Sequence, residues 1–168
     1  MIDELLANNR AFAASQPSRA LDGRPSRQVA VVTCMDSRLD VLAALGLGIG
    51  EAHIMRNAGG VITDDMIRSL AISQRRLGTR EVMIIHHTKC GMQTLTDDEF
   101  RAELLEATGI APAFAIESFS DLDADVRQSI LRVRRSPFLA HRELVRGFIY
   151  DVDTHALREV HADEQGGV

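Results

Sequence analysis

The sequence is poor in cysteine, with only Cys34 and Cys90 among its 168 residues. It also lacks the cationic start and apolar segment of a secretory signal, and nowhere do about eighteen apolar residues follow one another. We therefore expect a soluble, cytoplasmic protein. Disulfides are uncommon in a reducing cytosol, so free thiols available to a metal are favoured over a bond between the two cysteines.

An excess of basic residues is also missing, because 19 basic side chains stand against 24 acidic ones and the formal net charge is −5. This balance supplies no basic face for nucleic acid or for an anionic membrane, and it favours a small-molecule substrate. A length of 168 residues with 45% hydrophobic side chains can bury one ordinary core. We expect a single domain over residues 1–168.

Short apolar runs rich in β-branched residues predict the strands. Three such runs, typical of strands buried on both faces of a parallel sheet, are followed by a fourth and by a short antiparallel edge strand after the turn at Asp153 and Thr154. The predicted strands span 28–34, 51–56, 81–87, 147–152 and 157–160.

Helical periodicity fills most of the intervals between these runs. Thr63 and Gly78 bracket a helix over 64–77, and Thr96 with Glu99 has the spacing of a capping box. Further helices are predicted over 3–14 and 122–135, whereas 111–121 has no period and indicates a packed loop. Alternating strands and helices predict an α/β fold with a central, mainly parallel sheet flanked by helices.

Both cysteines lie where predicted strands end. Cys34 closes one run, and His87 and Cys90 close another, at the sheet edge where ligands gather in parallel α/β proteins. Two thiolates and one imidazole suit a tetrahedral zinc ion with a fourth position open for water, which favours catalysis over a structural site. His87 is preferred to His86, because a tight turn over the three-residue step brings it to the same ion as Cys90. One Zn²⁺ per chain is expected, in a formally neutral site whose activity rises with pH.

Asp36 and Arg38 follow the first cysteine at two-residue steps. Asp36 is close enough to accept a hydrogen bond from zinc-bound water, and Arg38 can hold that carboxylate with a forked pair of hydrogen bonds. If Arg38 released it, Asp36 could instead bind the zinc and close the site. A simpler interpretation makes Asp36 the cap of a helix beginning near Leu39 and Arg38 part of a surface ion pair.

Three short motifs occur in the order found in a known protein family. Cys34-x-Asp36-x-Arg38, then Arg56-Asn57-Ala58-Gly59-Gly60, then His87-x-x-Cys90-Gly91 resembles the β-class carbonic anhydrases of compact bacterial type, over about Leu5 to Val160. The resemblance implies zinc on Cys34, His87 and Cys90, an Asp36–Arg38 pair, and the strand order 2-1-3-4. It further implies a homodimer or larger homo-oligomer in which the helix over 3–14 packs on a neighbouring subunit.

The expected reaction is the reversible hydration of carbon dioxide to bicarbonate and a proton. Zinc-bound hydroxide, oriented by Asp36, attacks carbon dioxide held in a pocket near Gly59, Gly60 and Val61. Two alternatives remain open. Relatives of the β-class hydrolyse carbonyl sulfide or carbon disulfide at a similar site, and a non-catalytic module would use Asp36 as a permanent fourth zinc ligand.

Overall fold

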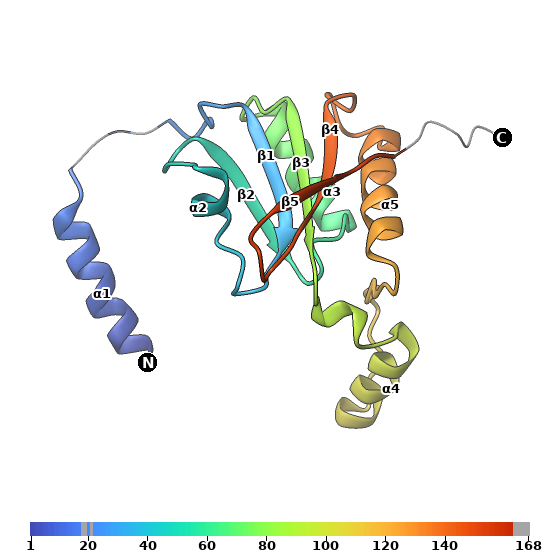
Figure 1. Ribbon diagram of the computed structural model, residues 1–168. Coiled ribbons are helices and arrows are strands. Elements are labelled where there is room, and N and C mark those ends of the chain that lie inside the picture. Colours follow the sequence, from blue (N-terminus) through green and yellow to red (C-terminus); the bar gives the residue numbers. More distant parts are fainter. Residues whose placement is uncertain (18–19, 21, 163–168) are drawn as a thin grey trace.

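One five-stranded sheet organises the chain, in the order β2-β1-β3-β4-β5 (Figure 1). The computed structural model describes residues 1–17, 20 and 22–162. The first four strands are parallel and β5 pairs antiparallel with β4, so the predicted mainly parallel sheet with an antiparallel edge is confirmed. The elements are α1 Ile2–Ser15, β1 Val29–Cys34, α2 Val41–Leu45, β2 Ala52–Asn57, α3 Asp64–Arg75, β3 Glu81–His87, a 3-10 turn η1 Gly91–Gln93, α4 Asp97–Thr108, α5 Leu122–Arg135, β4 Val145–Tyr150 and β5 Leu157–Val160.

Most predicted boundaries agree with the structure within two residues. The fourth strand was predicted two residues too late, because Val145 already pairs with Val82 and is buried. The strand stops before Asp151, whose carboxylate accepts hydrogen bonds from two backbone amides of the following turn. The capping box of α4 is present, with Thr96 and Glu99 bonded reciprocally.

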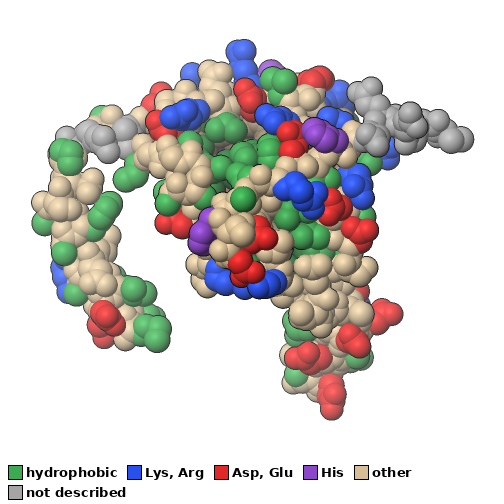
Figure 2. All heavy atoms as spheres, in the orientation of Figure 1, with side chains coloured by type: hydrophobic (Ala, Val, Ile, Leu, Met, Phe, Trp, Pro, Cys, Tyr) green, Lys and Arg blue, Asp and Glu red, His purple; other side chains and the backbone are tan. Residues whose placement is uncertain are grey.

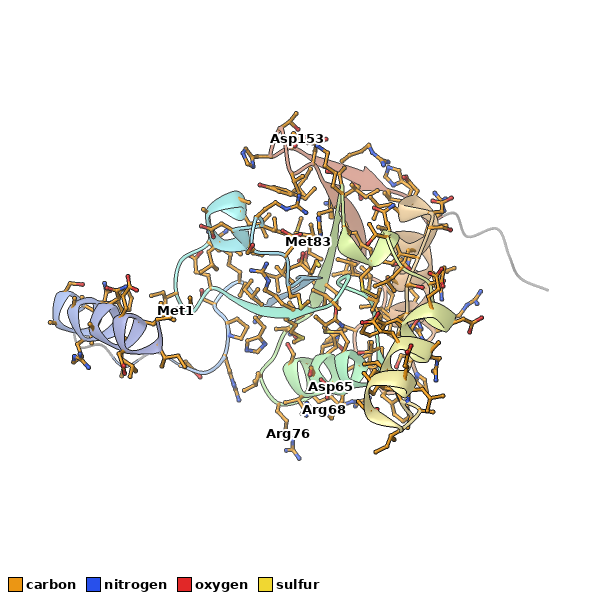
Figure 3. The ribbon with its side chains drawn as sticks, turned by 90° about the horizontal axis from the view of Figure 1, so that it is seen from below. Met1, Asp65, Arg68, Arg76, Met83 and Asp153 are labelled. Atoms are coloured by element: carbon orange, nitrogen blue, oxygen red, sulfur yellow. The ribbon has the colours of Figure 1, made fainter. Side chains whose placement is uncertain are left out.

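The two faces of the sheet are covered unequally. On one face α3 and α5 pack over a large core that contains Val32, Leu70, Ile84 and Ile130. The opposite face has a smaller core around Val31 and is covered by the short helix α2 and by loops. Figure 3 shows this arrangement, with Arg68 of α3 and Arg76 just after it on one side of the sheet and Asp153 on the other.

The helix α1 stands apart from the sheet (Figures 1 and 2). None of its residues is buried, although it carries large apolar side chains; Phe12, for example, is 53% exposed. Among the residues that the structure describes, no helix is both long and apolar enough to cross a bilayer.

The packing of α5 against β4 depends on a glycine. A Cβ atom at Gly147 would lie 2.5 Å from Val126 Cγ1 and 2.7 Å from Ile130 Cδ1, both on α5. Gly147 is also buried within its strand. The absent side chain therefore permits the close approach of this helix to the sheet.

We expect Gly147→Ala to lower the free energy of unfolding by about 1–3 kcal/mol, because the added methyl group overpacks the core. Thermal or urea unfolding would measure this loss. Gly23→Ala is the matched control, since nothing lies within 4 Å of a Cβ atom there. Equal stability of the two variants would contradict this account of the packing.

Candidate metal centre

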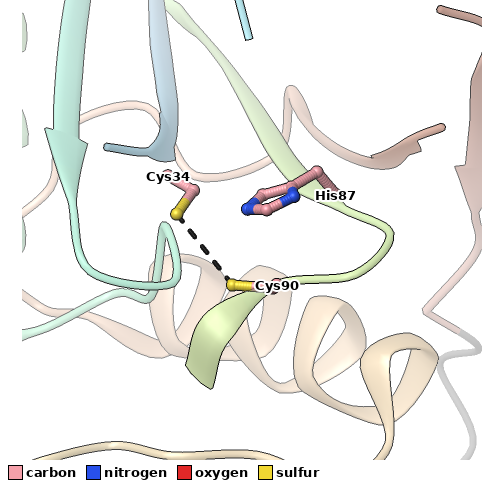
Figure 4. A group of neighbouring side chains, drawn as sticks. All are labelled: Cys34, His87 and Cys90. Carbon is pink, nitrogen blue, oxygen red and sulfur yellow. Dashed lines mark hydrogen bonds between the residues drawn. The ribbon is translucent and has the colours of Figure 1, made fainter. Parts of the chain in front are cut away.

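Three chain segments meet at the carboxyl edge of the sheet. Parallel pairing aligns Cys34 at the end of β1 with Asn57 at the end of β2, and Thr33 with Ile85 of β3. The adjacent end of β3 supplies His87, and the turn after it supplies Cys90. The structure thus brings Cys34, His87 and Cys90 together from positions 56 residues apart in sequence (Figure 4).

The spacing of the three side chains fits one small cation. The Sγ atoms of Cys34 and Cys90 are 4.0 Å apart, and all three ligand atoms lie within 4.8 Å of one another. Two sulfurs on a tetrahedral zinc ion, each at about 2.3 Å, are separated by about 3.8 Å. The observed cluster therefore needs little adjustment to hold zinc.

The orientation of the His87 ring also fits a metal ligand. Its Nδ1 donates a hydrogen bond to the Thr88 carbonyl oxygen at 2.9 Å. In the neutral ring this leaves Nε2 without a proton, and that atom is buried with no hydrogen-bond partner among the described residues. A buried lone pair without a partner, fixed by a bond at the other ring nitrogen, is the usual state of a histidine that binds zinc.

The neighbouring histidine points to the opposite face of β3. His86 Nε2 lies 2.6 Å from Asp125 Oδ2 on α5, and its ring packs against Phe119 at a centroid distance of 5.6 Å. His86 is fully buried by these contacts. The structure therefore separates His86 from the cysteine pair, in agreement with the preference for His87 as the ligand.

A hydrogen bond joins the two sulfurs. The hydrogen bond with Cys90 lowers the pKa of the Cys34 thiol to about 4, while the same contact and burial raise the pKa of Cys90. Cys34 is 5% exposed and Cys90 2%. A buried dication that displaced this proton would convert both sulfurs to thiolate ligands.

Asp36 lies beside the cluster and is held by Arg38. Arg38 Nε and Nη2 donate to the two carboxylate oxygens at 2.9 and 2.7 Å, and the Arg38 backbone amide adds a third bond at 2.9 Å. This bonding keeps the pKa of Asp36 well below its usual range. Asp36 Oδ2 is 3.7 Å from His87 Nε2, so the ionised carboxylate borders the place that a metal would occupy.

The helix-cap interpretation of Asp36 is wrong. Asp40 occupies the N-cap of α2, and its carboxylate accepts a hydrogen bond from the Ala43 amide at 3.2 Å. Asp36 is therefore free to interact with Arg38 and with the cluster.

The contacts of several residues that support the site were not predicted from the sequence, although Arg56 belongs to a motif that carries the resemblance. Arg56 donates to the carbonyl oxygens of Cys34 and Asp36 at 2.8 and 2.6 Å and so fixes the loop between them. Lys89 has a left-handed backbone (φ 56°), and its carbonyl oxygen accepts a bond from Arg38 Nη2 at 3.0 Å. Phe119 packs in the cluster formed with Cys34, Val61 and Cys90. For Phe119 a partial signal existed, since the aperiodic segment 111–121 that contains it was predicted to be a packed loop.

An apolar cavity of about 410 Å³ adjoins the cluster. It lies between the end of β2 and the loop that carries Phe114, and its walls include Met35, Val61, Met92 and Phe100. Of the three residues predicted for a substrate pocket, Val61 lines this cavity.

Gly59 and Gly60 lie behind the cavity and have structural contacts of their own. A Cβ atom at Gly59 would lie 3.1 Å from the Phe119 ring, and one at Gly60 would lie 2.8 Å from the Cys34 backbone nitrogen. Both glycines have positive φ angles, of 80° and 74°. Gly60 thus allows the loop after β2 to press against the end of β1.

We expect Gly60→Ala to displace the backbone at Cys34 and to speed the reaction of both buried cysteines with a thiol reagent in metal-free protein. Gly109→Ala is the matched control, because its φ of 73° carries the same left-handed strain but nothing lies within 4 Å of its Cβ position. Equal thiol reactivity in the two variants would show that the contact with Cys34 is unimportant.

Comparison with known proteins agrees with this geometry. The family model described as carbonic anhydrase matches residues 29–157. The β-carbonic anhydrase 1 of Mycobacterium tuberculosis is 51% identical over 158 residues, covering 94% of this chain and 96% of the relative. The crystal structure of a carbonic anhydrase from Streptococcus mutans superposes with a TM-score of 0.90 at 43% identity, covering 95% of this chain and 97% of the other.

A second group of relatives carries another name. A carbon disulfide hydrolase from Saccharolobus solfataricus is 33% identical over 168 residues, covering 85% of this chain and 82% of the relative. Sequence, strand order and the arrangement of the cysteine and histidine side chains agree with one another, and the chain belongs to the β-carbonic anhydrase family.

Proposed function

We propose that this protein is a zinc enzyme that catalyses the reversible hydration of carbon dioxide to bicarbonate and a proton. The observation that carries the proposal is the buried convergence of Cys34, His87 and Cys90, with His87 Nε2 free to bind a metal. These three residues would hold one zinc ion. Bound there, zinc supplies a nucleophile near neutral pH by lowering the pKa of water.

Asp36 and Arg38 would act on the attacking water. An ionised carboxylate is a hydrogen-bond acceptor only, so Asp36 would take a bond from this water and turn a lone pair toward the substrate. Arg38 would keep Asp36 from becoming a ligand itself, because its two guanidinium bonds occupy both carboxylate oxygens. This two-point hold supports an open catalytic site over a structural one closed by Asp36.

The cavity beside Val61 would receive the substrate. Carbon dioxide is linear and carries no net charge, and the walls of this cavity are largely aliphatic, aromatic or thioether groups. Gly59 and Gly60 would contribute indirectly, since they set the position of Val61 and of the Cys34 backbone. Bicarbonate is an anion and would therefore leave an apolar cavity more readily than carbon dioxide does.

The second candidate is hydrolysis of carbonyl sulfide or carbon disulfide. It is favoured by the relatives named carbon disulfide hydrolase and by a cavity that has room for the larger sulfur atoms. Carbon dioxide is preferred because the β-carbonic anhydrase relative has 51% identity, against 33% for the hydrolase.

Stopped-flow hydration of carbon dioxide, with zinc content measured on the same samples, tests the proposal. Wild-type protein should contain one zinc per chain and turn over faster as pH rises from mildly acidic to alkaline. Cys34→Ser should lose most of the zinc. Asp36→Asn should fold and keep its zinc but lose about 10- to 100-fold in turnover, because an amide cannot accept a hydrogen bond from the attacking water and orient it as the carboxylate does.

Different results would identify the alternatives. Negligible hydration at full zinc occupancy, together with sulfide release from carbon disulfide, would assign the hydrolase function. Loss of zinc and stability in Asp36→Asn would instead indicate a structural module in which Asp36 is a permanent ligand.

We also propose a single domain and a homodimer or larger homo-oligomer. The apolar face of α1 carries Leu5, Leu6 and Phe12, and no described part of the chain covers it (Figure 2). A second copy of the chain would bury this face. A cytoplasmic location stays a prediction, consistent with the two free thiols.

We expect Phe12→Glu to shift the protein toward monomer in light scattering behind a sizing column, because a charge replaces an apolar contact on α1. Ala11→Glu adds the same charge on the opposite side of the helix and should leave the assembly unchanged. A wild-type protein that is monomeric at all concentrations would contradict the proposal.

A further inference from the structure

A second and larger cavity lies between α3 and α5. Its volume is about 840 Å³, within the range of small-molecule sites, and it shares no lining residue with the apolar cavity beside the metal centre. One wall is a single stripe of α5, with residues at steps of three and one along the helix: Ala124, Arg127, Gln128, Leu131, Arg132 and Arg135.

The stripe is cationic. Arg132 pairs with Glu117 at 2.9 Å, whereas the guanidinium groups of Arg127 and Arg135 make no ion pair or hydrogen bond within the described residues. Arginines in the last turn of a helix often serve its negative C-terminal end, which would account for Arg135. Arg127 lies in the middle of α5 and cannot have that role.

A buried hydroxyl group without a partner lies at the end of the same stripe. Ser136 follows α5, lines the cavity and is 8% exposed, and its Oγ finds no hydrogen-bond partner among the described residues. Buried polar groups are normally paired, so an unpaired one beside a free arginine indicates that a ligand or water completes the bonding.

The loop that carries Ser136 and Phe138 is fastened in place. Arg75 of α3 donates to the Phe138 carbonyl oxygen at 2.7 Å, and the Gln74 side chain bonds the backbone of His141 at both its amide and its carbonyl group. The Phe138 side chain nevertheless stays 66% exposed on the rim of the cavity. A flat apolar ring is therefore available for stacking at a preformed site.

We propose that this groove binds a phosphorylated small molecule of nucleotide size. Guanidinium groups bind phosphate oxygens through paired hydrogen bonds, and two unpaired arginines suit a multiply charged anion. The Ser136 hydroxyl would donate to a phosphate oxygen beside Arg135, and Phe138 would stack on the base. Asp64, at the start of α3, is the one carboxylate among the lining residues that the structure describes, and its negative charge directs an anion toward the arginines of α5.

Calorimetric titration of the full-length protein with ADP tests this site. Arg135→Glu should weaken ADP binding by about tenfold or more, the loss expected for a charged hydrogen-bonded contact. Arg134→Glu is the matched control. It makes the same charge change at the preceding residue of α5, outside the groove, and should change ADP affinity by less than about twofold. Carbon dioxide turnover should be unaffected by Arg135→Glu, which separates this site from the proposed catalytic one.

Three outcomes would overturn the proposal. The first is the absence of ADP binding by the wild-type protein at millimolar concentrations, and the second is an equal loss in Arg134→Glu and Arg135→Glu. The third is a loss of carbon dioxide turnover in Arg135→Glu at unchanged zinc content, which would place Arg135 in the catalytic site. Phe138→Ala should weaken the binding of ADP but not that of pyrophosphate, which has no base. An equal effect on both ligands would show that Phe138 does not stack on the base.

Discussion

The parallel pairing of β1 between β2 and β3 is the constraint on which the rest of the site depends. It aligns the ends of three strands at one edge, so that Cys34, the loop after β2 and His87 occupy adjacent positions. Gly60 then lets that loop touch the backbone at Cys34. A register slip of one residue in β1 or β3 would turn Cys34 or His87 to the other face, because side chains alternate along a strand.

Two arginine side chains at this edge of the sheet together bind a carboxylate and backbone carbonyl oxygens. Two sulfurs and the Asp36 carboxylate crowd one small volume, and unbalanced negative charge in a buried place is unfavourable. Arg38 neutralises Asp36, and both Arg38 and Arg56 donate to carbonyl oxygens of the two ligand-bearing loops. The arginines therefore fix the backbone that carries the ligands and also offset the negative charge of the sulfurs and of Asp36. Loss of Arg38 or of Arg56 would disturb both effects.

The parts predicted well from the sequence are those with a local physical cause. Runs of β-branched residues marked β1 and β3, and the cap at Thr63 and the capping box at Thr96 marked helix starts. The short helix α2 has only five residues and too little periodicity to be recognised, although Asp40 caps it. The predicted strand begins at Gly147, two residues after the observed start of β4. Glycine at this position is instead required by the close contact with α5 inside the strand.

At the site the same division holds. The three-residue step from His87 to Cys90 is local, and so it could be interpreted from spacing alone. The hydrogen bonds of Arg56 and Lys89 join residues far apart along the chain, and no local pattern encodes them. For Phe119 the sequence indicated a packed loop but not its contact with the cysteine pair. Arg132 illustrates the point most fully: it lines the groove on α5 and also pairs with Glu117, two residues before Phe119, which packs over the cysteine pair. One side chain on the surface of α5 thus links the groove to the loop that carries Phe119, so the surroundings of the metal centre are held partly by a contact outside it.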